Sequence, residues 1–446
     1  MASAADKFAR LAALRPAPRR EAEAQSCTLR DPNDEDRLAR LIGAGIGRNR
    51  YGDHLTVKKW FATPELFSPT IETIDLLSRT RDASLSRRTR TALENPENWL
   101  FLDTETTGIS GGTGTYAFLI GIAWWDAGGL QVEQLIMRDF TEEYSLLQEL
   151  ATRLAERPVL VTFNGKTFDW PLLESRFTMT RAIKTPKLAA HLDLLHPARA
   201  VWKLRLGSVR LIELERHVLD APRLGWHREN DVQSALIPQF YFDYLRGGTA
   251  EPLAGVVLHN QMDLRGLGAL FGKMNEVLTP NESGNHEIDG LDLFGLSRFL
   301  QRRGEMERAS EECARALDRG LPAEHRSRAK KDLAQLAKRG GQLDRAVQCW
   351  QELLADADSC IHACEQLASY YERHAKDLKM AEEVCQLALA RLERKKWTTR
   401  DLIQAARNSQ IEARLTCRLN RLRKRMKSKP ELPLAPKHSA TTHPEP

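Results

Sequence analysis

Several features are scarce in this chain of 446 residues, and each argues against a class of protein. No window holds the ~20 consecutive apolar residues that a membrane-spanning helix needs. Residues 1–24 lack the apolar segment of a secretory signal, although their arginines and alanines are also typical of a transit peptide. The seven cysteines fit neither a zinc site nor a disulfide framework in their spacing. We therefore expect a cytoplasmic protein with no membrane partner.

Positive charge is concentrated near the C-terminus. The net charge of the whole chain is only +6, but Arg414 to Lys429 read RLTCRLNRLRKRMKSK, without a carboxylate. Such a run attracts polyanions because it releases their condensed counterions. It is equally compatible with a solvated helix end that leads into a disordered tail, which we expect over residues 411–446.

The length of the chain predicts two or three domains. Residues 1–30 carry no stable apolar stripe, and residues 1–50 are expected to form a poorly ordered segment. Residues 51–97 form a small N-terminal extension, in which YGDHLTVKKWF predicts a short strand or hairpin. The main domain is expected at residues 98–275.

Within that main domain, apolar runs bounded by glycines or proline predict strands, and helical spacing predicts helices. The order is three strands, helix, strand, helix, strand, as read from WLFL, AFLIGIAWW, LQVEQLIMRDF, EEYSLLQELATRLAE, PVLVTFNG, FDWPLLESRF and HLDL. This order resembles the ribonuclease-H-like arrangement, an α/β fold with a mixed sheet flanked by helices.

Residues 290–410 have a different composition, rich in Ala, Leu, Glu, Arg and Gln. Three segments align so that Ala309, Ala346 and Ala381 share one position, 37 and 35 residues apart. This period is close to the ~34 residues of a tetratricopeptide helical hairpin, and the small residue allows two helices to pack closely. We expect all-α tetratricopeptide-like repeats; a generic helical bundle is the alternative.

The first chemical motif is FLDTETTG, residues 101–108. Asp103 and Glu105 lie two residues apart on a predicted strand, so both side chains leave the same face. Burying two carboxylates together is costly unless cations neutralise them, and Mg²⁺ or Mn²⁺ prefer such oxygen ligands. The pair also occurs on ordinary exposed strands, but the apolar residues before it favour a buried site.

Two further motifs follow in order along the chain. In TFNGKTFDWPLL, Asp169 lies near the start of a predicted helix, where it would also serve as a helix cap. In HNQMDLRGLGAL, His259 and Asp263 are four residues apart, so a helix places them one turn apart on one face. Singly, such a His–Asp pair is usually a surface feature.

Together these motifs resemble the DEDD superfamily of 3′–5′ exonucleases and, more narrowly, the YprB-type ribonuclease-H-like family, over residues 98–272. The resemblance implies that Asp103, Glu105, Asp169 and Asp263 hold two divalent ions, Mg²⁺ or Mn²⁺. It also implies that His259 orients the attacking water or takes its proton. The spacing of four is that of the tyrosine-type subgroup, however, so His259 stands where those enzymes carry tyrosine.

Candidates for substrate binding are less specific. Thr106, Thr107, Asn164 and Lys166 are placed to contact a phosphate or the terminal nucleotide, although a loop cap explains Asn164 equally well. The loop with Thr113, Gly114 and Tyr116 either closes on a base or is a tight turn. Three other residues are expected to be structural before they are ligands: Asp193, His196 and Asp231.

The leading hypothesis is a metal-dependent nuclease that trims DNA or RNA from a 3′ end by a two-metal mechanism. One alternative is a nucleic-acid-binding scaffold whose helical repeats bind a protein partner. Another is a structure-specific endonuclease, because ribonuclease-H-like folds host both activities.

Overall fold

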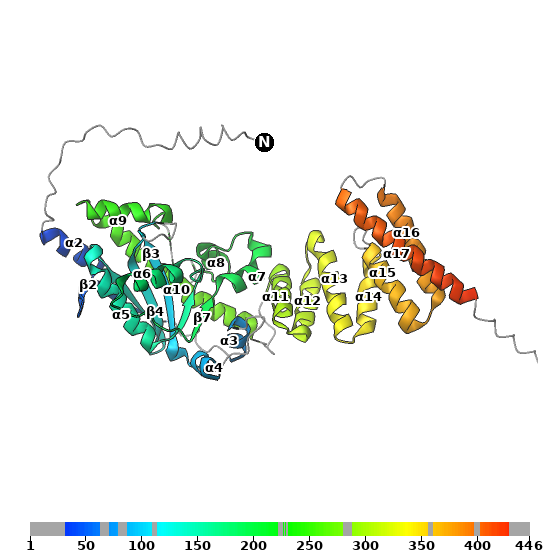
Figure 1. Ribbon diagram of the computed structural model, residues 1–446, viewed down its shortest axis with the longest axis horizontal. Helices are drawn as coiled ribbons and strands as arrows, with labels where there is room; N and C mark the ends of the chain where they lie inside the picture. Colours follow the sequence, from blue (N-terminus) through cyan, green and yellow to red (C-terminus); the bar gives the residue numbers. More distant parts are fainter. Residues whose placement is uncertain are drawn as a thin grey trace, which may run out of the picture. The chain divides into compact units, whose positions relative to one another are not determined.

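The chain forms two compact units in the computed structural model (Figure 1). One unit combines residues 1–67, 91–191 and 225–269, and the other combines residues 68–90, 192–224 and 270–446, in each case as far as they are described. The described residues are 32–62, 71–78, 87–108, 114–221, 226, 228, 231–279, 288–355, 360–396 and 402–427.

A seven-stranded mixed sheet forms the centre of the first unit, in the order β1-β2-β5-β4-β3-β6-β7. Strands β1 to β5 pair antiparallel along this order, whereas β6 pairs with β3 in parallel. The mixed sheet predicted from the sequence is thus confirmed. Its strands are β1 Gly45–Asn49, β2 Gly52–Ala62, β3 Trp99–Thr106, β4 Ala117–Asp126, β5 Gly129–Ile136, β6 Val159–Thr162 and β7 Ala190–Asp193.

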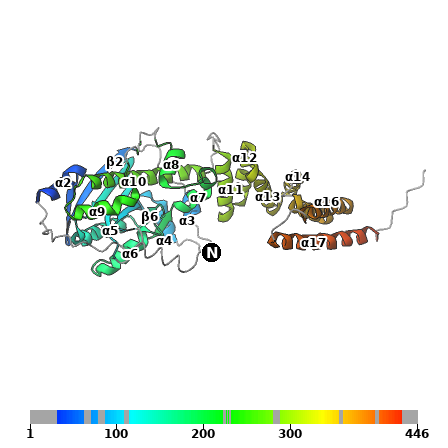
Figure 2. The ribbon, with the colours of Figure 1, turned by 90° about the horizontal axis from the view of Figure 1, so that it is seen from above.

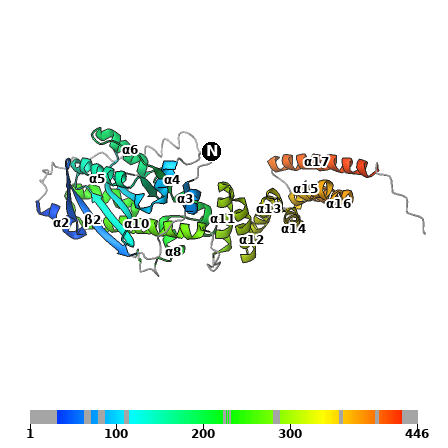
Figure 3. The same ribbon diagram turned by 90° about the horizontal axis from the view of Figure 1, so that it is seen from below.

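Helices cover both faces of this sheet. Neighbouring residues of β5 point to opposite faces: Glu133 pairs with Arg153 of α5 (Glu143–Glu156) at 2.8 Å, while Gln134 Nε2 donates to Asn260 Oδ1 of α10 (Glu251–Leu278) at 2.9 Å. Helices α5 and α10 therefore lie on opposite faces, as Figures 2 and 3 show. Because neither face of the central strands is solvated, their sequences are continuously apolar rather than alternating.

The remaining helices before residue 288 are shorter. Among them, α9 contributes Tyr241, whose ring stacks on Phe118 of β4 with centroids 4.2 Å apart. Their bounds are α2 Pro32–Ile42, α3 Ile71–Ser78, α4 Arg87–Glu94, α6 Asp169–Thr180, α7 Leu195–Leu206, α8 Leu211–His217 and α9 Ile237–Leu245, with 3₁₀ turns at Pro96–Asn98, Phe140–Glu142 and Ser234–Leu236.

The N-terminal region differs from the expectation of a poorly ordered segment and a separate extension. Residues 1–31 lie outside the described residues, but from Pro32 the chain forms α2 and then β1. Strand β1 pairs with β2, and β2 pairs with β5 through Leu55 opposite Ile136. Residues 45–62 therefore form a hairpin that completes the edge of the main sheet; its second strand lies in the segment predicted as a short strand or hairpin, and its first strand lies in the segment expected to be poorly ordered.

The second unit is rich in helices, as predicted. Consecutive helices pack as hairpins, α11 with α12, α13 with α14, and α15 with α16, and α17 packs on α16. These helices are α11 Gly290–Arg303, α12 Met306–Arg319, α13 Ala323–Arg339, α14 Leu343–Leu353, α15 Cys360–Tyr370, α16 Leu378–Lys396 and α17 Leu402–Lys427, and a π-helical segment, Tyr371–Ala375, continues α15.

The aligned alanines occupy equivalent places in the three hairpins. Ala309, Ala346 and Ala381 are completely buried near the start of the second helix of each pair. A residue with positive φ ends the turn before each of them, namely Gly304, Gly341 and Lys376. This geometry supports a repeat, while the tetratricopeptide assignment stays a prediction.

The C-terminal region also differs from expectation. Residues 411–427 belong to α17 rather than to a disordered tail, and residues 428–446 lie outside the described part. Leu415, Leu419 and Leu422 are buried at helical spacing, which explains why this strongly basic stretch folds as a packed helix. Among the described helices, none combines the length and the apolar character needed to cross a membrane.

Candidate functional site

Two carboxylates stand on the α10 face of the sheet, at the end of β3. Asp103 lies opposite Gly121 of β4, which lies opposite Gln134 of β5, the residue that bonds α10. Glu105 follows two residues later, just before an irregularity in the β3–β4 register. The strand alternation predicted for Asp103 and Glu105 therefore directs both toward α10.

Helix α10 brings three polar residues to this end of the sheet. Asn260 Nδ2 donates to Asp103 Oδ2 at 2.8 Å, which ties the helix to the first carboxylate. His259 Nε2 lies 3.5 Å from Asp263 Oδ2, one helical turn away, and 4.0 Å from Glu105 Oε1. The predicted single helix face for His259 and Asp263 is thus observed.

Asp169 approaches from the first turn of α6. Its Oδ1 accepts a hydrogen bond from Thr104 Oγ1 at 2.6 Å. The residue preceding the helix is Phe168, so Asp169 is the first helical residue rather than its N-cap. The position of Asp169 beside β3 places a fourth carboxylate in the same charge cluster.

The electrostatics of the cluster show how close these groups lie. Burial raises the pKa of Asp103 well above its usual value, and the charges of Asp263, Glu105 and Asp169 raise it further. Burial also raises the pKa of Glu105, again with contributions from neighbouring carboxylates. Two partly buried groups whose ionised forms are this unfavourable fit a site that binds cations.

His259 has a carboxylate on its other side. Its Nδ1 lies 2.7 Å from Asp231 Oδ1, and the residue is 9% exposed. Burial acts to raise the pKa of Asp231, but hydrogen bonds from His259 and Arg228 outweigh it and lower the pKa overall. Asp231 therefore stays ionised, and the hydrogen bond between it and His259 must use a proton on Nδ1.

Arg228 supplies a positive charge at the rim of the cluster. Its guanidinium pairs with Asp231 Oδ2 at 3.0 Å and with Asp263 Oδ1 at 2.5 Å. Asp231 Oδ1 also accepts from the backbone N–H of Val232 at 2.9 Å. Because both oxygens of Asp231 already have donors, Asp231 acts as a structural acceptor, in agreement with the sequence expectation.

One oxygen or nitrogen from each of Glu105, His259 and Asp263 lies within 4.8 Å of the other two. Such a group of carboxylates and imidazole suits a divalent metal ion, which ribonuclease-H-like folds generally use. Asp103 and Asp169 border this group through the charge interactions described above.

The predicted substrate-binding residues have mixed surroundings. Thr106 Oγ1 donates to the carbonyl of Gly108 at 2.8 Å, and Thr107 Oγ1 accepts from the backbone N–H of Tyr116 at 2.9 Å. Thr107 is buried, so its hydroxyl serves the loop rather than a ligand. Asn164 lies in a turn with a φ of +69°, and Lys166 is exposed beside it.

The remaining candidates have structural contacts. Tyr116 packs under the guanidinium of Arg176, 3.8 Å from the ring centroid, which ties this loop to α6; Thr113 lies outside the described residues. Asp193 Oδ1 accepts from the backbone N–H of Leu195 at the start of α7. The exposed residue His196 belongs to α7 and to the second unit. The contact of Asp193 agrees with the expected structural role, and the same expectation for His196 stays a prediction.

Three residues that position the site had no assigned role in the sequence. Asn260 bonds Asp103, and Gln134 in turn bonds Asn260. A Cβ on Gly121 would lie 2.1 Å from Asn260 Oδ1, so the strand needs glycine there. The glycine inside the apolar run FLIGI is a sequence signal for such a close approach.

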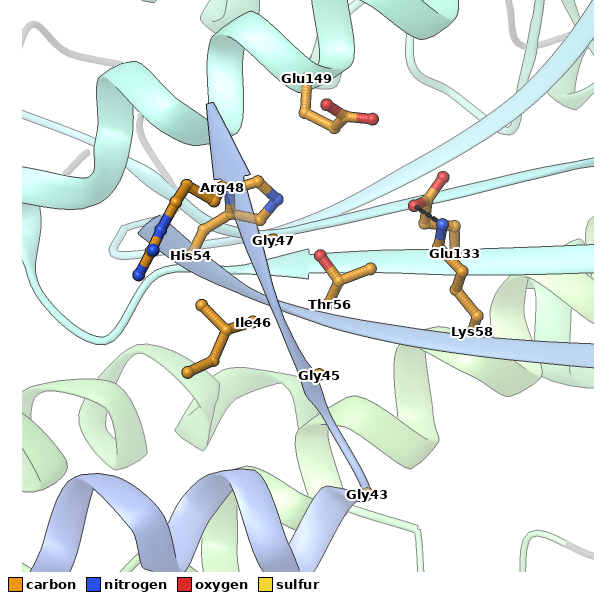
Figure 4. A pocket seen from close by; sticks show the side chains of 10 residues that line it. All are labelled: Gly43, Gly45, Ile46, Gly47, Arg48, His54, Thr56, Lys58, Glu133 and Glu149. Atoms are coloured by element: carbon orange, nitrogen blue, oxygen red, sulfur yellow. Dashed lines mark ion pairs between the residues drawn. The ribbon is translucent and has the colours of Figure 1, made fainter. Parts of the chain in front are cut away.

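A hollow of about 490 Å³ lies at the β1–β2 edge of the sheet, on the α5 face (Figure 4). Gly47 lies opposite His54 in the register, and the His54 ring fills the space that a side chain there would take. His54 Nδ1 bonds Ser145 Oγ at 2.8 Å, and Lys58 pairs with Glu133 at 3.1 Å. This hollow therefore belongs to the packing of the hairpin on α5, on the face opposite the carboxylates.

Comparison with known proteins agrees with this geometry. Residues 100–275 match the RNase_H superfamily, an interval that contains all four carboxylates and His259. The chain is also 31% identical to the uncharacterized protein YprB of Bacillus subtilis (strain 168) over 300 residues, which are 66% of this chain and 70% of YprB. The aligned length exceeds the superfamily interval, so the likeness extends into the flanking sequence. The chain therefore belongs to the family of YprB, within the RNase_H superfamily.

Proposed function

We propose that this protein is a metal-dependent 3′–5′ exonuclease acting on DNA or RNA through a two-metal mechanism. Membership in the RNase_H superfamily supports a nuclease-like function with a nucleic acid substrate. The exonuclease mode and the two ions go beyond that membership and rest on the site.

The observation that carries the proposal is the convergence of four carboxylates from three separate elements. Asp103 and Glu105 come from β3, Asp169 from α6 and Asp263 from α10. Burial, and then their mutual repulsion, raises the pKa of Asp103 and Glu105, a cost that a protein without a bound cation has no evident reason to keep.

In this proposal each carboxylate holds divalent ions. Such ions, when bound, supply a nucleophile at neutral pH and stabilise negative charge on a phosphate. Asn260 keeps Asp103 oriented, and Thr104 keeps Asp169 oriented. Lys166 and Asn164 are the candidates to contact the substrate strand, because they lie on the turn that leads into α6.

The test is hydrolysis of matched 5′-labelled single-stranded DNA and RNA with Mg²⁺ or Mn²⁺. We expect a ladder of products shortened from the 3′ end, and loss of turnover by at least about a hundredfold in Asp103→Asn and Asp263→Asn. Asp126→Asn changes an exposed carboxylate at the end of β4 and should leave turnover unchanged.

The product pattern distinguishes the modes of cleavage. Discrete internal cuts would show that the protein acts as an endonuclease and not as the proposed exonuclease. Undiminished hydrolysis in both site variants would overturn the assignment of the carboxylates. The same reaction on DNA and RNA decides between the two substrates.

A further inference from the structure

His259 presents a buried nitrogen to the carboxylates without a hydrogen bond. Among the described residues, Nδ1 bonds Asp231, whereas Nε2 has only the two longer contacts to Asp263 and Glu105. An N–H···O bond would bring such atoms to about 2.9 Å, well below the observed 3.5 and 4.0 Å.

The bond to Asp231 determines which nitrogen of His259 is available to a ligand. A carboxylate only accepts, so Nδ1 carries a proton, and Nε2 is the nitrogen that can offer a lone pair to a metal ion. That lone pair faces two carboxylate oxygens, one of Glu105 and one of Asp263. Three acceptors facing one another repel unless a cation lies between them.

The distances match a shared ion better than they match direct contacts. Ligand atoms about 2.1 Å from one ion are about 3.0 Å apart in neighbouring positions and about 4.2 Å apart in opposite positions. The Nε2 distances of 3.5 and 4.0 Å lie between these two values, too long for hydrogen bonds but short enough for one ion to reach all three ligand atoms. The two oxygens of Asp263 have different partners. Oδ1 pairs with Arg228, whereas Oδ2 lies toward His259 and is the oxygen placed to bind the same ion.

We propose that His259 Nε2 is itself a metal ligand, together with Glu105 and Asp263, and that Asp231 positions it. A metal-binding histidine commonly donates its other ring N–H to a carboxylate, which sets its tautomer and orientation. This role replaces the general-base role that the family resemblance implied for His259, because one lone pair cannot serve both.

A nitrogen ligand has a consequence for the choice of ion. Mg²⁺ favours oxygen ligands, whereas first-row transition ions accept imidazole readily. The site is therefore expected to bind Mn²⁺ more tightly than Mg²⁺, with His259 as the source of the difference. This inference rests on the proposed metal-dependent function but concerns ion binding, which is measured without a substrate.

The direct test is pulsed electron paramagnetic resonance of the full-length wild-type protein loaded with Mn²⁺ alone. We expect a nitrogen hyperfine coupling that changes on ¹⁵N labelling of histidine. His259→Gln should abolish the coupling and weaken Mn²⁺ binding about tenfold or more in calorimetry, with a change of less than about threefold for Mg²⁺. His196→Gln removes an exposed histidine of α7 and should change neither readout.

Asp231 is tested in the same way. Asp231→Asn should weaken Mn²⁺ binding by about tenfold, as loss of such a supporting carboxylate does, and Asp231→Glu should recover part of the loss. If the wild-type protein binds Mn²⁺ without a nitrogen coupling, or does not bind Mn²⁺, the ligand role of His259 is overturned; this readout needs no variant to fold.

The two proposals fail separately. A protein with the nitrogen coupling that cuts neither DNA nor RNA keeps the ligand assignment and loses the exonuclease. A protein that cuts nucleic acid with Mn²⁺ held through oxygen alone keeps the nuclease function and loses the ligand assignment of His259.

Discussion

At the scale of single residues, Asp103 carries a large electrostatic cost. Burial and the neighbouring carboxylates raise its pKa well above the usual value. A carboxyl group whose pKa is raised by folding stabilises the folded state fully below its unfolded pKa, near 4. This contribution is lost as the pH rises through the raised value, so the metal-free protein becomes less stable toward neutral pH.

We therefore expect Asp103→Asn to stabilise the protein in EDTA while removing its activity. The gain should be about 1–2 kcal/mol near pH 8, as for other substitutions that relieve functional strain, and smaller near pH 4. Thermal melts of wild type and variant in EDTA at the two pH values measure it. A variant less stable than wild type at pH 8 would contradict the repulsion argument.

The sequence predicts some of the site residues for reasons that are local. Alternation along a strand places Asp103 beside Glu105, and the period of a helix relates His259 to Asp263. Asp231, in contrast, meets His259 only because a loop distant in sequence folds over α10. Its role depends on a tertiary contact, and no local pattern encodes that contact.

At the scale of elements, the central strands were predictable because both faces are buried and their sequences are continuously apolar. Strand β1, GIGRN, has little strand propensity, and it forms because β2 offers a ladder to pair with. Helix α17 looks like a charged tail because its buried leucines are sparse among arginines. Both elements form because of tertiary contacts, the pairing of β1 with β2 and the packing of the α17 leucines, which local propensity does not reveal.

The turns of the helical hairpins allow a reciprocal prediction. Gly341 has a φ of +76° and Lys376, at the equivalent position, a φ of +56°. A residue with a Cβ pays about 1 kcal/mol or more in this left-handed region, whereas glycine does not. Lys376→Gly should therefore stabilise the protein by about 0.5–1 kcal/mol, and Gly341→Ala should destabilise it by about 1 kcal/mol.

Urea denaturation followed by circular dichroism measures both changes. A loss of stability in Lys376→Gly would show that the lysine side chain contributes more than its backbone conformation costs. That result would also weaken the equivalence of the three hairpins, on which the tetratricopeptide prediction and its protein partner depend.

At the scale of the whole molecule, the basic C-terminal run is partly neutralised within the second unit. Glu365 pairs with Arg414 at 2.9 Å, and Glu382 pairs with Arg423 at 2.7 Å. The basic run that contributes to the net charge of +6 is thus not a free polycation, because some of its arginines pair with glutamates. The arginines of α17 that pair in this way stabilise the helix first, so attraction of a polyanion by this run is weaker than its composition indicates.

Glu372 is the centre of this neutralisation and provides the test. It is 6% exposed and contacts Arg421 at 2.8 Å, Arg425 at 3.1 Å and Arg418 at 3.6 Å, all from α17. Removing the carboxylate leaves three arginines facing one another, and hydrogen bonds to charged groups contribute about 1.5–3 kcal/mol each when buried. Because these arginines are partly exposed, Glu372→Gln should cost about 2 kcal/mol in total.

The contacts of Glu372 with these arginines also make the stability of the protein depend on pH. Burial acts to raise the pKa of Glu372, but Arg421 and its neighbours lower it overall. A lowered pKa stabilises the folded state above the unfolded value, near 4.3, and this stability is lost as the pH falls through the folded value. In urea denaturation the difference in unfolding free energy between wild type and Glu372→Gln should therefore be full at pH 7 and shrink below about pH 4.

The matched control is Glu383→Gln, which changes an exposed glutamate of α16. Equal stability of wild type and Glu372→Gln at pH 7 would mean that the leucines alone hold α17, and that its arginines are available to a polyanion after all.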